Sequence, residues 1–225
     1  MKIVLVPGAC HGAWWYRPVV DVLAARGRSA LALTLPGLCE RVEEQGATLA
    51  SHVADVTATV AALDEEVVLV GHSYGGMVVA GVADALPGRV RGLLSVDGFA
   101  PRDGDSCWSG VDDAMRAWYV DASGRSGTGV DPMPQFDPRT TPHPLASLVQ
   151  RIRLTGAYRG VRHYALAADP TWTPHSPFPA IAERLRTDPA WTVTDLPTTH
   201  NVLRDGTEHL VGAIEALVAE VERAG

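Results

Sequence analysis

One serine in the sequence sits in a pattern that is typical of a catalytic nucleophile. Residues 71–75 read Gly-His-Ser-Tyr-Gly and are the only G-x-S-x-G match in the 225 residues. This pattern places a serine on a sharp turn between a strand and a helix, where glycines allow the two elements to come close. The apolar run 67–70 and the helical pattern 75–86 supply both elements, so we predict Ser73 as the nucleophile. A serine in an ordinary glycine turn is the alternative.

A histidine should act as the base, because a serine hydroxyl is a weak nucleophile at neutral pH. His200 lies between the last predicted strand and the last predicted helix, at the edge of the sheet where Ser73 also lies. We therefore predict His200 as the base, against the alternative of a solvated loop histidine. The other histidines lie beside fixed backbone turns, on helices, in proline-rich segments or at the opposite strand end: His11, His72, His52, His209, His143, His175 and His163.

Two aspartates compete to orient this base. Asp169 follows the predicted strand 162–167 and gives the chain order Ser, Asp, His. Asp97 is the rival candidate, since it directly follows another predicted strand, 91–96. We predict Asp169 as the acid and expect Asp97 to anchor the start of the next segment through hydrogen bonds.

Attack on an acyl carbon creates an oxyanion that needs hydrogen-bond donors. The backbone N–H of Tyr74, directly after the nucleophile and at a helix N-terminus, is the first predicted donor. The second should come from the glycine-containing loop 7–12, where we predict the N–H of Ala9.

Short apolar runs alternate with helical patterns along the chain. The expected strands are 2–6, 29–33, 67–70, 91–96, 162–167 and 191–196, and the expected helices are 18–27, 49–63, 75–86, 180–186 and 206–223. Buried strands that alternate with helices predict an α/β fold, with a mostly parallel sheet covered by helices on both faces. We expect one domain over residues 1–225.

The segment 98–160 interrupts this alternation, because it shows no strand pattern and is rich in glycine and proline over 124–144. Two helices are expected in it, at 111–121 and 145–154. We interpret 98–160 as a short cap insertion above the sheet, part helical and part mobile. A linker between two domains is the alternative, but the pieces on either side need each other to complete one sheet.

Composition excludes several other classes. A net charge of −7 disfavours nucleic-acid binding, and three distant cysteines without a C-x-x-C pair argue against disulfides and a zinc site. The longest apolar stretch, 67–86, is interrupted by glycines, His72 and Asp84, and residues 1–8 lack a signal-peptide pattern. We expect a cytoplasmic protein with no membrane partner, no metal and no cofactor.

Three stretches resemble the α/β-hydrolase superfamily, and within it the plant methylesterase and hydroxynitrile lyase branch with its bacterial esterase relatives. They are residues 6–14, 71–77 and 97–101. The resemblance implies a triad of Ser73, His200 and Asp169, with an oxyanion hole from the amides of Ala9 and Tyr74. Hydroxynitrile lyases also use a lysine near the acid. Lys2 is the only lysine of this chain, so cyanohydrin cleavage is not expected.

Large apolar side chains of the loops and the insertion suggest an apolar cleft over the serine. We predict four tryptophans as substrate-binding residues, with packing of the insertion as the alternative: Trp14, Trp108, Trp118 and Trp172.

The leading hypothesis is a serine carboxylesterase that acts on a small hydrophobic ester or thioester through an acyl-enzyme. One alternative is a non-hydrolytic lyase, cyclase or epimerase on the same scaffold, acting on a biosynthetic intermediate such as a polyketide. Another is a binding protein without turnover. The expected partner is a small-molecule substrate, and the sequence leaves a homodimer open.

Overall fold

Six strands form one parallel sheet in the computed structural model, which describes residues 1–169 and 175–224. Their spatial order is β2-β1-β3-β4-β7-β8, and every neighbouring pair is parallel. The strands are β1 (Lys2–Val6), β2 (Ala30–Ala32), β3 (Val67–His72), β4 (Val90–Val96), β7 (Val161–Ala167) and β8 (Thr192–Leu196). The α/β fold predicted from the sequence is confirmed.

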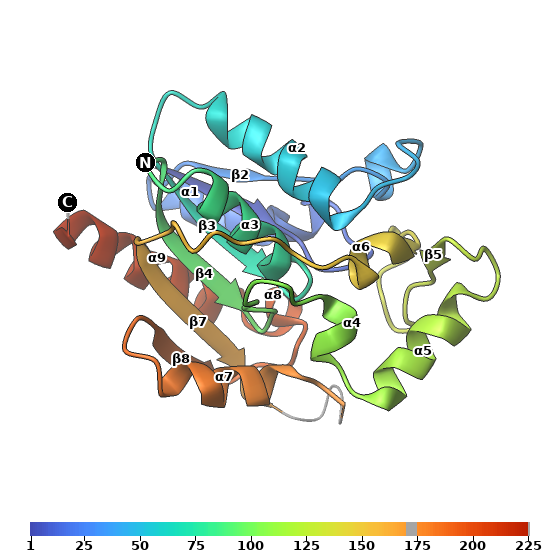
Figure 1. Ribbon diagram of the computed structural model, residues 1–225. Coiled ribbons are helices and arrows are strands. Elements are labelled where there is room, and N and C mark those ends of the chain that lie inside the picture. The colour runs from blue at the N-terminus through green and yellow to red at the C-terminus, as the bar shows by residue number, and fades with distance from the viewer. Residues whose placement is uncertain (170–174, 225) are drawn as a thin grey trace.

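Helices cover both faces of this sheet (Figure 1). On one face, α1 (Arg17–Ala25) and α9 (Thr207–Ala224) pack together, and α9 lies against β4, β7 and β8. On the other face lie α2 (Leu49–Ala61), α3 (Gly75–Ala85) and α7 (Phe178–Arg186). Successive side chains of a strand point to opposite faces, so Ile3 and Leu5 enter the first core and Val4 and Val6 enter the second.

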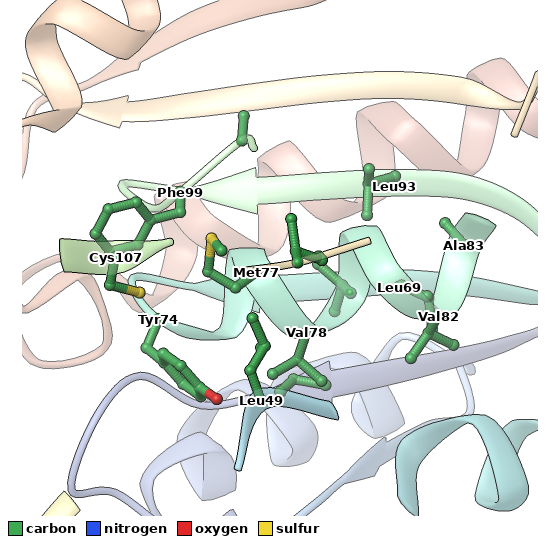
Figure 2. Close-up of a cluster of buried hydrophobic side chains, with 14 of the residues drawn as sticks. Leu49, Leu69, Tyr74, Met77, Val78, Val82, Ala83, Leu93, Phe99 and Cys107 are labelled. Carbon is green, nitrogen blue, oxygen red and sulfur yellow. The ribbon is translucent and has the colours of Figure 1, made fainter. Parts of the chain in front are cut away.

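The central helix α3 is buried nearly all round, which fits its composition of glycine, alanine, valine and methionine. Figure 2 shows Met77, Val78 and Val82 of α3 packed among side chains of the sheet and of α2. The helix therefore has a fixed position, and so does the turn that precedes it.

The segment between β4 and β7 lies at the carboxyl edge of the sheet (Figure 1). It contains α4 (Cys107–Gly110), α5 (Asp113–Ser123), β5 (Gly129–Val130), β6 (His143–Pro144) and α6 (Leu145–Val149). The expectation of no strand here is wrong, because β5 and β6 pair antiparallel. Strands of two residues are too short to leave an alternating pattern in the sequence.

Two helices of this segment also differ from their predicted bounds. Helix α5 begins after Asp112, whose carboxylate accepts a hydrogen bond from the amide of Met115. Helix α6 ends at Val149, five residues before the predicted end, because Gln150 has an extended backbone. The chain then runs without regular structure to β7.

Candidate active site

Ser73 occupies the turn between β3 and α3, as the sequence predicts. Its backbone φ is 51°, in the left-handed region that side chains other than glycine rarely adopt. The loop after β4 holds this strained turn: the Ser73 amide donates to the carbonyl of Val96, and the Phe99 amide donates to the carbonyl of Ser73. The serine is thus fixed by a neighbouring strand end.

Glycines around this turn are required by the packing. A Cβ on Gly71 would lie 2.5 Å from the carbonyl oxygen of Gly75, and a Cβ on Gly75 would lie 2.5 Å from that of Val6. A Cβ on Gly76 would collide with the carbonyl oxygen of Phe99. These contacts explain physically why the serine pattern carries its flanking glycines.

His200 lies in the loop between β8 and α8 (Val202–Asp205), and its ring is held on several sides. Its Nδ1 atom is 2.6 Å from Oδ2 of Asp97. The ring stacks on Phe178 at a centroid distance of 5.3 Å and packs against the ring of His72 at 4.5 Å. Since an ionised carboxylate can only accept, Nδ1–H donates to Asp97 and leaves Nε2 as the basic nitrogen.

Asp97 thus takes the position that we predicted for Asp169. Its side chain is 5% exposed, and its second oxygen, Oδ1, accepts a hydrogen bond from the amide of Ala167 at 3.1 Å. Asp169 is exposed, and its amide donates to the carbonyl of Thr198. The prediction of Asp169 as the partner of His200 is therefore corrected to Asp97, because Asp97 ends the strand beside the nucleophile strand.

A local signal for Asp97 was present in the sequence. The residue after it is Gly98, where a Cβ would lie 2.7 Å from the Ser73 amide nitrogen. An Asp-Gly pair after a buried strand therefore marks the loop that touches the nucleophile turn. Chain order alone favoured neither aspartate, since both lie between Ser73 and His200.

His72 connects the nucleophile turn to the histidine loop. Its Nε2–H donates to the backbone carbonyl of His200 at 2.9 Å. Burial lowers the pKa of His72 well below its ordinary value, and the neighbouring His200 adds to this effect. His72 is therefore neutral and holds the loop of His200 in place. His11 likewise forms a hydrogen bond to the carbonyl of Ala9 at 2.7 Å.

The two predicted oxyanion donors come from different segments of the chain. Tyr74 is the N-terminal cap of α3, and Ala9 lies in the loop after β1. Among the described residues, neither backbone N–H has a hydrogen-bond acceptor. Ala9, Ser73 and Tyr74 line one cavity together.

Two cavities meet at Ser73 and His200. The first, which we call the polar cavity, has a volume of about 490 Å³ and is lined in part by charged and amide side chains. In it, the Arg139 guanidinium lies 3.9 Å above the ring of Trp14 and forms an ion pair with Asp137. This cavity suits a group that carries polar atoms.

The second, the apolar cavity, has a volume of about 100 Å³. Ala9, Ser73, Phe136 and His200 line both cavities, which places them at the junction. The remaining lining is mostly aromatic and aliphatic, with six large side chains from the insertion and its surroundings: Met115, Trp118, Tyr119, Met133, Leu148 and Phe178. A small apolar group fits this space.

The four tryptophans predicted to bind substrate have different positions. Trp14 lines the polar cavity and Trp118 lines the apolar cavity. Trp108 packs against the core beside Tyr119 and is absent from both linings. Trp172 lies outside the described residues.

Within residues 1–169 and 175–224, no group of three or more His, Cys, Asp or Glu side chains is arranged to hold a metal ion. In the same part of the chain, no helix has the length and apolar character needed to cross a membrane.

Comparison with known proteins places this geometry among relatives. The profile described as "Alpha/beta hydrolase family" matches residues 3–225. The "Carbendazim hydrolyzing esterase" of Nocardioides sp. is 31% identical over 240 residues, covering 96% of this chain and 99% of that protein. "Methylesterase 2" of Arabidopsis thaliana is 36% identical over 112 residues, but the match covers only 44% of this chain and 39% of that protein.

Solved structures share the fold at lower identity. An extracellular alpha/beta-hydrolase from a Paenibacillus species superposes with a TM-score of 0.83 at 17% identity, covering 96% of this chain and 98% of that one. A pyrethroid hydrolase from Sphingobium faniae JZ-2 gives 0.70 at 20% identity, with 96% of each chain covered.

Proposed function

The chain belongs to the alpha/beta hydrolase family, and on this premise we propose that it is a serine carboxylesterase that works through an acyl-enzyme. The observation that carries the proposal is the position of His200. It is hydrogen-bonded to buried Asp97 through Nδ1 and lines the same two cavities as Ser73. Nucleophile, base and orienting acid thus meet at one edge of the sheet.

The reaction follows from the roles of these atoms. His200 Nε2 removes the proton from Ser73 Oγ, which attacks the acyl carbon and opens its carbonyl bond. The backbone N–H groups of Ala9 and Tyr74 stabilise the resulting oxyanion, and Asp97 stabilises the imidazolium. His200 then returns the proton to the departing alkoxide or thiolate. Water, activated by the same nitrogen, cleaves the acyl-enzyme and releases the acid.

The two cavities favour a small, hydrophobic acyl group. The apolar cavity of about 100 Å³ has room for a short acyl chain, and it contains both proposed oxyanion residues, Ala9 and Tyr74. The larger polar cavity, with Trp14 and Arg139, is then available to the alcohol or thiol part. An esterase and methylesterases among the relatives support ester hydrolysis as the reaction class.

A reducing compartment is consistent with the cysteines. Cys10, Cys39 and Cys107 are free thiols, and burial raises the pKa of Cys10 to about 12, which keeps it protonated. Free thiols of this kind are typical of cytosolic proteins, and we propose a cytoplasmic location.

The test is labelling and turnover with matched variants. Wild-type protein should react with a fluorophosphonate probe at Ser73 and hydrolyse p-nitrophenyl butyrate. Ser73→Ala should lose both, with kcat reduced at least about 10⁴-fold. Ser29→Ala, which changes an exposed serine, should behave as wild type. If the wild type neither labels at Ser73 nor exceeds Ser73→Ala in turnover, the esterase assignment is wrong.

A further inference from the structure

The oxyanion loop has a strained residue directly after Ala9. Cys10 has a φ of 69°, in the left-handed region, although it carries a side chain. Such a conformation costs on the order of 1–3 kcal/mol and persists only where surrounding contacts determine it. The contacts of Cys10 therefore decide where the Ala9–Cys10 peptide lies, and with it the neighbouring amide of Ala9.

Those contacts come largely from the insertion. The Cys10 amide donates to Nδ1 of His143 at 3.3 Å, and the Thr141 amide donates to the Cys10 carbonyl at 3.1 Å. The thiol of Cys10 points to the carbonyl of Val130 at 3.9 Å. Residues more than 115 positions away in the chain thus hold both backbone groups and the side chain of one loop residue.

His143 can accept this hydrogen bond only in one tautomer, and the structure determines which. Its Nε2 atom is 2.9 Å from Oγ of Ser147, and that hydroxyl donates to the carbonyl of Pro144 at 2.8 Å. The hydroxyl proton is therefore used, so Nε2–H of His143 donates to Ser147 and Nδ1 stays free to accept from Cys10. His143 is fully buried, and burial lowers its pKa well below the ordinary value, which keeps the ring neutral.

The same ring also contacts the second oxyanion residue. The rings of His143 and Tyr74 meet edge to face at a centroid distance of 4.4 Å. The Tyr74 hydroxyl donates to Nδ1 of His52 at 2.7 Å, while Nε2–H of His52 donates to the carbonyl of Pro36 at 2.9 Å. Figure 2 shows the Tyr74 side chain extending away from α3 toward Leu49 of α2. His143 thus contacts one proposed oxyanion residue, Tyr74, and the residue that directly follows the other, Ala9.

We propose that His143 is a positioning residue for the oxyanion hole, through which the insertion sets the orientation of the Ala9 and Tyr74 amides. The inference rests on the proposed function. It does not make His143 catalytic, because the ring acts through the peptide of Cys10 and the side chain of Tyr74. A consequence is that the segment that shapes the apolar cavity also affects the rate of acylation.

Two substitutions at His143 separate the hydrogen bond from simple packing. His143→Asn keeps an acceptor near the position of Nδ1, whereas His143→Leu removes it and keeps an apolar side chain. We expect His143→Leu to lower kcat for p-nitrophenyl butyrate by about 10- to 100-fold with little change in KM. Its affinity for phenylboronic acid, a mimic of the tetrahedral oxyanion, should fall by a similar factor. His143→Asn should stay within about threefold of wild type in both.

If the wild type is active and His143→Leu and His143→Asn have the same kcat and the same affinity for the boronic acid, the proposal for His143 is wrong. The esterase function would not be affected by that result. An inactive wild type would overturn only the esterase function. The contact between Cys10 and His143 can still be tested then, because hydrogen exchange of the Cys10 amide does not require turnover. Protection of this amide should fall in His143→Leu and persist in His143→Asn. Unchanged protection in His143→Leu would overturn the proposal.

Ser147→Ala serves if His143→Leu does not fold. It leaves Nε2–H without its acceptor and thereby weakens the preference for the tautomer that accepts from Cys10. We expect kcat to fall about three- to tenfold, together with boronic acid affinity. Wild-type values for both would contradict a role for this hydrogen-bond chain.

Discussion

The catalytic edge of the sheet and the insertion above it are built in different ways. At the edge, each proposed catalytic residue follows a strand of the central sheet: Ser73 follows β3, Asp97 follows β4 and His200 comes after β8. Two of them, Ser73 and Asp97, have positive φ, and neighbouring strand ends hold them. The insertion has three helices and a pair of strands of two residues each among its described residues, and it contacts the loop after β1 through the side chain of His143 and the backbone of Thr141.

We infer from this difference that the sheet edge carries the reacting groups and that the insertion determines which substrates fit. Strand ends in a packed sheet have little freedom, so the triad geometry depends on backbone that the whole core stabilises. The insertion supplies most of the apolar lining through residues such as Met115, Trp118 and Met133. We infer that changes in this lining can alter the accepted substrate size without moving Ser73, Asp97 or His200, and that His143 couples the two regions.

Substitution of the two candidate aspartates by asparagine, one at a time, gives the largest expected effect. Asp97→Asn should lower kcat about 10⁴-fold, because an amide in this position no longer fixes His200 with its proton on Nδ1. Asp169→Asn should stay within about threefold of wild type, since its side chain is exposed. Steady-state kinetics with p-nitrophenyl butyrate measure both. A greater loss in Asp169→Asn would return the acid role to Asp169 and break the distinction drawn here.

Addition of a methyl group at a glycine tests how rigidly the edge of the sheet is packed. Gly76→Ala would force a Cβ onto the carbonyl oxygen of Phe99, where backbone must move, and should reduce the free energy of unfolding by at least about 3 kcal/mol. Gly212→Ala, in α9, meets no atom within 4 Å and should raise it by about 1 kcal/mol. Urea denaturation compares the two. Similar stabilities would mean that the packing at the edge is looser than described.

Acid should destabilise the edge through His11. Burial lowers the pKa of His11 to about 4, against 6.5 for an ordinary histidine, although its hydrogen bond to Ala9 opposes the shift. The unfolded chain therefore binds a proton that the folded chain does not between these values, and stability falls as the pH drops from 6.5 to 4. The loss from this residue is on the order of 3 kcal/mol.

Unfolding by urea at several pH values checks this dependence. His11→Gln should flatten the slope between pH 6.5 and 4, while His209→Gln, which changes an exposed helix residue, should leave it as in wild type. An unchanged slope in His11→Gln would show that other groups cause the acid sensitivity. His72 and His143 are candidates, since burial lowers their pKa values as well.

The smallest expected effect is on the acyl chain length that the apolar cavity accepts. Trp118→Ala enlarges the apolar cavity, and the ratio of kcat/KM for p-nitrophenyl hexanoate over butyrate should rise about tenfold. Trp108→Phe, outside both cavity linings, should leave this ratio unchanged. An unaltered ratio in Trp118→Ala would mean that the acyl group does not bind in the apolar cavity. The insertion would then not determine the acyl chain length.

The sequence by itself determined the sheet and the turn that carries Ser73, and it predicted His200 as the base, because each has a local signature. Apolar runs mark buried strands, the glycines beside Ser73 are required by its turn, and His200 lies in a short loop after the last strand. The short strands β5 and β6 left no such signature.

Only the tertiary structure decided which aspartate pairs with His200, which residues line the cavities and what the loop 7–12 contacts. Asp97 and Asp169 are equivalent by chain order, and β7, which precedes Asp169, even lies next to β8, so only the 2.6 Å contact between Asp97 Oδ2 and His200 Nδ1 distinguishes them. Trp108 and Trp118 are equally apolar, yet only Trp118 lines a cavity that contains Ser73. The contact between Cys10 and His143 joins residues 133 positions apart. Such pairings depend on how distant segments pack, which no local pattern encodes.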